Sequence, residues 1–89
     1  MVVDIKNFGE ILMSRPSGRE AFLMAKAYVF NNIMESEEIA LDFNEVKVLA
    51  PSWADEFISG IKLEYSNKIV YLNTENPSVK ASLDTILEQ

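Results

Sequence analysis

The side chains best suited to chemistry gather in the stretch "PSWADEF", residues 51–57, where the Ser52 hydroxyl precedes Asp55 by three residues. Three roles are open to Ser52: it could cap the start of a helix, accept a phosphoryl group, or form an active site with the carboxylates. The 89 residues include no cysteine and no histidine, so thiolate nucleophiles, imidazole bases and metal ligands of either kind are excluded. Chemistry in this chain must use carboxylates, hydroxyls and amines.

The capping role of Ser52 follows from its spacing to Asp55. A serine followed three residues later by an acid is typical of a helix start, because the hydroxyl accepts a hydrogen bond from a free backbone N–H of the first turn. Pro51 ends the preceding extended segment. The sequence therefore predicts Ser52 as the N-cap of a helix, and its replacement by alanine would cost ~1 kcal/mol by this mechanism.

A catalytic role would need more than the two neighbouring acids. Adjacent residues on a helix do not face each other, so Asp55 and Glu56 need Asp42, at the end of a predicted strand, as a further group. Three carboxylates could hold a hard cation through oxygen ligands. We expect no enzyme activity and no cofactor, and keep a metal or phosphoester site on Asp42, Asp55 and Glu56 as an alternative.

The elements that position these residues are predicted from periodicity. Alternating or β-branched residues predict strands at 37–43 and 68–73, and residues 2–5 and 11–13 are predicted to form a hairpin or a bent edge strand. Apolar residues at helical spacing predict helices over about 18–33, over 51–65 and from 77 onward.

Three smaller features refine these helices. Ser17, three residues before Glu20, is predicted to cap the first helix, and Asn76 before Pro77 is predicted to start the last. Gly60 is predicted to let the second helix approach the sheet closely. Strands and helices alternate, which predicts one small α/β domain over 1–89, with an approximately four-stranded mixed sheet whose central strands are parallel, and about three helices.

The charge balance limits the partners. The chain has 8 basic and 14 acidic residues, a net charge of −6, which repels a phosphate backbone and an anionic membrane surface alike. No stretch approaches the roughly 20 apolar residues needed to span a bilayer. We therefore expect a soluble cytoplasmic protein that binds neither nucleic acid nor membrane.

Two apolar features suggest contacts with other proteins. The first predicted helix has an apolar face wider than one side of a sheet requires, so a homodimer or accessory contact through Tyr28, Phe30 and Met34 is one interpretation, and burial within the fold is the other. Trp53, in the first turn of its helix, could anchor an interface or fold back onto the sheet edge.

The order of motifs resembles a known family. The stretch "IALDFNEVKVLAPSWADEF", preceded by "SRPSGREAF" and followed by "KIVYLN", resembles the STAS domain of sulfate transporters and anti-sigma-factor antagonists. It is more similar to the STAS-like branch of unassigned function. The resemblance covers most of the chain and implies a non-enzymatic regulatory module.

The resemblance also implies a phosphoacceptor and a partner. In the antagonists, this loop carries an aspartate, two serines and a glycine, and the second serine is phosphorylated by a histidine-kinase-like ATPase that is also the anti-sigma factor. Ser52 lies at that position, while Ala50, Pro51 and Trp53 depart from the motif. The partner would contact Ser52, Trp53, Asp55 and Glu56, and the nearest basic residue before this motif is Lys47.

Overall fold

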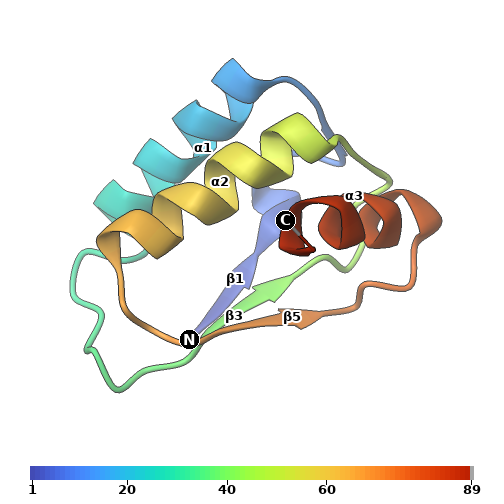
Figure 1. The fold of residues 1–89 in the computed structure, drawn as a ribbon. Helices are drawn as coiled ribbons and strands as arrows, with labels where there is room; N and C mark the ends of the chain where they lie inside the picture. Colours follow the sequence, from blue (N-terminus) through green and yellow to red (C-terminus); the bar gives the residue numbers. More distant parts are fainter. Residues whose placement is uncertain (89) are drawn as a thin grey trace.

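The computed structural model describes residues 1–88 and contains three helices beside short parallel strands (Figure 1). In chain order, the elements are β1 (Val2–Asp4), a 3₁₀ turn (Ile5–Phe8), β2 (Ile11–Leu12), α1 (Arg15–Tyr28), β3 (Ile39–Asp42), β4 (Val48–Leu49), α2 (Pro51–Glu64), β5 (Ile69–Leu72) and α3 (Pro77–Leu87). The predicted α/β class and the three helices are confirmed.

The strands form two sheets rather than one. The larger sheet has the order β1-β3-β5 and the smaller pairs β2 with β4, and every pairing is parallel. The prediction of one four-stranded mixed sheet is therefore wrong. So is the predicted hairpin, because the 3₁₀ turn and Gly9, at φ 135°, redirect the chain after β1 so that β2 pairs with β4.

The central strands match the sequence pattern. Ile39, Leu41 and Phe43 are buried, and β3 lies between β1 and β5 as the alternating pattern requires. The register places Leu41 beside Val3 on one side and Tyr71 on the other. Because all strands of this sheet run in one direction, their carboxyl ends meet at one edge of the molecule.

Two of the three predicted helix starts differ from the structure. Helix α1 begins at Arg15, and the side chain of Ser14 accepts a hydrogen bond from the Ser17 N–H, so Ser17 is not the cap. Helix α2 begins at Pro51 after Ala50, with no side-chain cap, so the prediction of Ser52 as the N-cap is also wrong. Proline fits the first turn of a helix because it has no N–H to satisfy and its φ is already helical.

The start of α3 is confirmed. Asn76 caps it, and its side-chain oxygen accepts hydrogen bonds from the N–H groups of Ser78 and Val79. Val79 and Leu83, four residues apart on one face of this helix, are buried. None of the three helices in residues 1–88 combines the length and apolar character needed to cross a bilayer.

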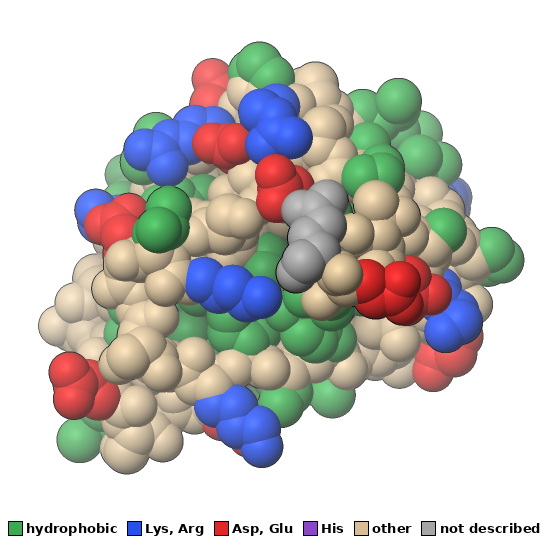
Figure 2. All heavy atoms as spheres, in the orientation of Figure 1, with side chains coloured by type: hydrophobic (Ala, Val, Ile, Leu, Met, Phe, Trp, Pro, Cys, Tyr) green, Lys and Arg blue, Asp and Glu red, His purple; other side chains and the backbone are tan. Residues whose placement is uncertain are grey.

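Helices α1 and α2 lie side by side over one face of the larger sheet, in contact through two glycines (Figure 1). A Cβ on Gly18 would lie 2.6 Å from the carbonyl oxygen of Trp53, and one on Gly60 would lie 2.8 Å from the ring of Phe22. Gly60 therefore lets α2 approach α1. The prediction that it lets α2 approach the sheet is wrong. An ion pair between Lys26 of α1 and Glu64 of α2 also joins the two helices. On the face shown in Figure 2, charged side chains of both signs are interspersed.

Candidate functional site

The start of α2 carries the residues that the sequence singled out. Ser52 is partly exposed in the first turn, and Asp55 and Glu56 follow one turn later. Residues three and four apart on a helix are neighbours, so the two carboxylates share a face with Ser52. The beginning of α1 lies against this turn, because Gly18 allows its backbone to contact Trp53.

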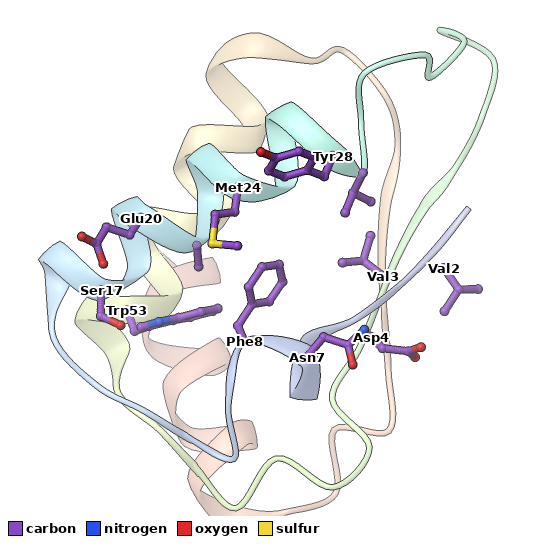
Figure 3. Close-up of a pocket in the computed structure, with 12 residues that line it drawn as sticks. Val2, Val3, Asp4, Asn7, Phe8, Ser17, Glu20, Met24, Tyr28 and Trp53 are labelled. Atoms are coloured by element: carbon purple, nitrogen blue, oxygen red, sulfur yellow. The ribbon is translucent and has the colours of Figure 1, made fainter.

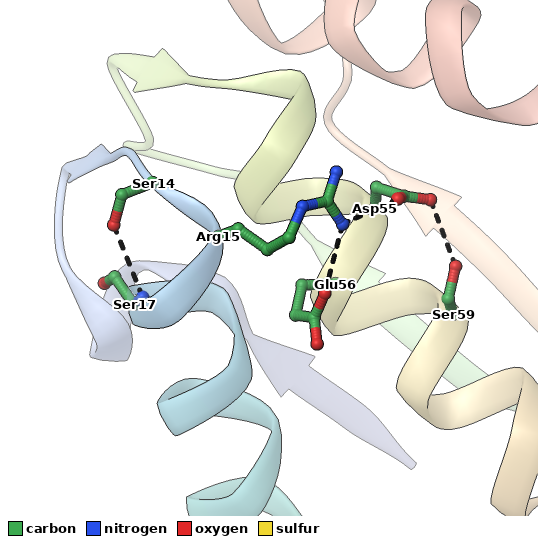
Figure 4. Close-up of polar contacts among 6 residues, drawn as sticks. All are labelled: Ser14, Arg15, Ser17, Asp55, Glu56 and Ser59. Atoms are coloured by element: carbon green, nitrogen blue, oxygen red, sulfur yellow. Dashed lines mark hydrogen bonds and ion pairs between the residues drawn. The ribbon is translucent and has the colours of Figure 1, made fainter.

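Arg15, the first residue of α1, joins the two helices at this point. Its Nη1 atom lies 2.9 Å from Oδ2 of Asp55 and 3.0 Å from Oε2 of Glu56 (Figure 4). The hydroxyl of Ser59 donates to Oδ1 of Asp55 at 3.1 Å, so both oxygens of that carboxylate are engaged. The sequence analysis missed Arg15. The only signal was its place in "SRPSGREAF", a stretch that carried the family resemblance.

This arrangement keeps the charges fixed. The hydrogen bond from Arg15 holds the pKa of the Asp55 carboxyl below its ordinary value, with a smaller contribution from Ser59 and an opposing one from partial burial. The hydrogen bond to Asp55, followed by the one to Glu56, raises the pKa of Arg15. Both groups therefore stay charged near neutral pH, as an ion pair requires.

Lys47 does not supply a positive charge to the start of α2. Its ammonium group lies 3.2 Å from Glu10 Oε1, in the region where β2 and β4 meet. The cation that the sequence could not supply near Ser52 comes instead from Arg15, 37 residues earlier in the chain. We define the Arg15–Ser52 surface as Arg15, Ser52, Asp55 and Glu56.

Trp53 does not belong to this surface. Its side chain is 1% exposed and stacks on Phe57 with ring centroids 5.0 Å apart, while Phe8 packs against both rings. The prediction that Trp53 anchors a partner is therefore corrected. The residue after Ser52 faces the core because successive positions on a helix are rotated by about 100°.

The hydrogen bonds of Asp42 go to Asn44 and Asn73 rather than to the start of α2. At the end of β3, its Oδ1 accepts hydrogen bonds from Asn73 Nδ2 at 2.8 Å and from the Asn44 N–H at 2.9 Å. The bond from Asn73, followed by that from Asn44, lowers the pKa of Asp42. Residues 1–88 contain no group of three acids arranged to hold a metal ion. The alternative site on Asp42, Asp55 and Glu56 is therefore not assembled.

The residues predicted to form a dimer contact are divided between surface and core. Tyr28 is 79% exposed and Met34 is 66% exposed, whereas Phe30 is 2% exposed and packs against Tyr65. Helix α1 ends at Tyr28, earlier than predicted, and the following turn directs Phe30 inward. Phe30 is therefore unavailable for a surface contact.

Comparison with known proteins identifies the family. The family model described as a STAS-like domain of unknown function (DUF4325) matches residues 25–79, more than half of the chain. The chain belongs to this family. No curated protein and no solved structure matches it.

The Arg15–Asp55 contact gives a pH-dependent prediction. The pKa of Asp55 is lower in the folded than in the unfolded chain, so the contact stabilises the fold fully above the unfolded pKa of about 3.9 and is lost as the pH falls through the folded pKa. We expect Arg15→Gln to lower the melting temperature at pH 7. The difference from the original protein should close below pH 4, as followed by circular dichroism.

Arg19→Gln is the matched control. It removes the same charge from the same helix, but the Arg19 guanidinium lies over the ring of Phe22 rather than beside a carboxylate of α2. Its difference from the original protein should change less with pH. Equal pH dependence in the two variants would contradict a specific role for the Arg15 contact.

Proposed function

We propose that this chain is a non-enzymatic regulatory module that binds a protein partner through the Arg15–Ser52 surface. Supporting the proposal are its membership of a STAS-like family and the position of Ser52, which resembles the phosphoacceptor of the antagonists. We place this activity in the cytoplasm, where ATP is available for phosphorylation. The partner by this resemblance is a histidine-kinase-like ATPase of the anti-sigma type.

The observation that carries the proposal is the double contact of Arg15 with Asp55 and Glu56 on the helix face that carries Ser52. One guanidinium pairs with two carboxylates at the start of a helix, which leaves one negative charge where the backbone N–H groups favour an anion. A phosphate on Ser52 would add nearly two negative charges within one turn of both acids. The phosphate would then compete with the Asp55 and Glu56 carboxylates for the Arg15 guanidinium.

Phosphorylation would therefore act by moving the Arg15 guanidinium from the two carboxylates to the phosphate. In this step, Ser52 Oγ forms a bond to the γ-phosphorus of ATP, the bond from that phosphorus to ADP breaks, and the hydroxyl proton passes to a base on the ATPase. Repulsion between the phosphate and the carboxylates favours movement of the Arg15 guanidinium toward the phosphate. The surface seen by the partner changes in charge and in side-chain arrangement, which is the basis of the proposed switch.

Binding by phosphomimetic variants tests the proposal. We expect the original domain, immobilised and exposed to native lysate, to retain a histidine-kinase-like ATPase, and Ser52→Glu to retain at least ~10-fold less of it, because an added charge at a close interface disrupts binding. Quantitative mass spectrometry of the retained proteins measures the ratio.

Ser52→Ala is the control for the missing hydroxyl. Since Ser52 does not cap α2, this variant should keep both the fold and the partner. Equal retention by all three proteins, or the absence of such an ATPase from each, would contradict the proposal.

A further inference from the structure

A groove runs between the edge strand β1 and helix α1, and Trp53 of α2 forms part of its lining (Figure 3). Its volume is about 450 Å³, within the range of pockets that hold ligand side chains. Apolar side chains of both elements and of the 3₁₀ turn line much of it. We call it the β1–α1 groove; the residues used below are Val2, Asp4, Phe8, Glu20, Met24 and Tyr28.

The sheet edge beside this groove is unpaired. Within residues 1–88, strand β1 pairs only with β3, and the Ala40 N–H donates to the Met1 carbonyl at 2.9 Å. Backbone groups alternate in direction along a strand, so Met1 and Val3 turn their carbonyls toward β3. The N–H and C=O of Val2 and the N–H of Asp4 therefore point to the open edge, where a further strand could bond to them.

Exposed apolar side chains line this edge. Val2 is 61% exposed, Met24 56% and Tyr28 79%, while Phe8 lies deeper in the groove. Natural proteins limit further pairing of edge strands by short strand length, charged side chains, proline or a covering segment. Strand β1, with the sequence "VVD", is short and carries Asp4 but has neither lysine nor proline. Its edge and the apolar groove beside it match the two requirements of strand addition, backbone bonds and pockets for alternate side chains.

The charge of the groove selects the kind of partner. Asp4 and Glu20 are its charged lining residues, and both are acidic. Pairing of two copies through β1 would bring these acids together in two chains that each carry a net charge of −6, which is unfavourable. An extended segment with lysine or arginine beside its apolar residues would instead place positive charges against them.

We propose that the β1–α1 groove binds an extended, cationic and apolar peptide segment of a partner protein, which adds to the open edge of β1 as a further strand. Alternate apolar side chains of the segment enter the groove over Phe8 and Met24. Its basic side chains lie on the other face of the added strand, near Asp4, and Glu20 adds negative charge at the rim of the groove. This site does not include Ser52, so it adds a second contact to the proposed regulatory module.

The test uses a fluorescein-labelled, acetylated octapeptide of alternating valine and lysine, with binding followed by fluorescence anisotropy. We expect saturable binding and changes in the amide NMR signals of Val2 and Asp4. A peptide with glutamate in place of lysine should bind at least ~10-fold more weakly, because like charges then meet at the groove. Of two versions N-methylated at alternate residues, the one that blocks the N–H groups facing β1 should lose at least ~10-fold.

Matched protein variants test the groove itself. Asp4→Asn with Glu20→Gln should weaken peptide binding at least ~10-fold, whereas Glu75→Gln with Asp84→Asn, the same charge change outside the groove, should weaken it much less. Equal weakening by both pairs would show a general charge effect and overturn the proposal. Equal affinity of both N-methylated peptides would overturn strand addition.

Two further results would assign the groove to another occupant. Sedimentation that shows a dimer without peptide, with the Val2 and Asp4 signals changing on dilution, would overturn the proposal in favour of a second copy. Peptide binding that leaves those two signals unchanged would place the segment elsewhere. Either result can be obtained whether or not Ser52→Glu changes retention of the ATPase, so the two proposals fail separately.

Discussion

Trp53→Ala is expected to destabilise the protein by ~3–5 kcal/mol, the range for removal of a large aromatic side chain from a core. The indole is 1% exposed and contacts the rings of Phe57 and Phe8, so its loss leaves a large cavity below the α1–α2 pair. Small domains are stable by about 5–15 kcal/mol in total. We expect the melting temperature to fall by at least ~12 °C, measured by circular dichroism or calorimetry.

Trp53→Phe provides the matched control, because it keeps an aromatic ring that can stack on Phe57. Its melting temperature should lie between those of the original protein and Trp53→Ala. A fall of less than ~3 °C for Trp53→Ala, together with lost partner binding, would contradict the burial of the indole and restore the interface role considered from sequence.

Much of the central fold could be predicted from the sequence because it depends on local pattern. The alternation of Ile39, Leu41 and Phe43 identifies a buried strand without knowledge of its neighbours. Asn76 before Pro77 identifies the start of α3 because cap and proline act within one turn. Sheet membership is different: β2 has only two residues, and nothing local to it specifies pairing with β4 rather than β1.

The incorrect helix caps show two local rules in competition. Ser17 and Ser52 both have an acid three residues later, and neither is an N-cap in the structure. In both helices a proline, Pro16 or Pro51, lies in the first turn and the helix begins around it. Because proline restricts the backbone by covalent geometry whereas a cap contributes only ~1 kcal/mol, the proline was the better guide to the helix start.

The Arg15–Ser52 surface could be predicted only in part because it depends on contact between distant segments. Ser52, Asp55 and Glu56 were identifiable from their spacing on one helix face. Arg15 joins them from 40 residues before Asp55, and no periodicity relates positions so far apart. The contact exists because α1 and α2 approach closely, which in turn requires the absence of a side chain at Gly18.

Gly18→Ala therefore tests the basis of the whole arrangement. At an exposed helix position, alanine would stabilise the helix by ~1 kcal/mol relative to glycine. Here the added Cβ would lie 2.6 Å from the carbonyl oxygen and 3.0 Å from the Cα of Trp53, and these backbone atoms cannot rotate away. We expect a net loss of ~2–3 kcal/mol and a fall in melting temperature of at least ~8 °C, measured by calorimetry.

The clash should also separate Arg15 from its two carboxylates, because α1 must shift away from α2 at its first turn. Gly60→Ala distinguishes this effect from simple loss of stability: its Cβ meets the ring of Phe22, away from the Arg15 contact. Both variants should have a lower melting temperature than the original protein, but the change in the Arg15 guanidinium NMR signal should be larger for Gly18→Ala. A Gly18→Ala protein with unchanged or increased melting temperature would show that the helices are not in contact at Gly18, and the geometry of the Arg15–Ser52 surface would then be incorrect.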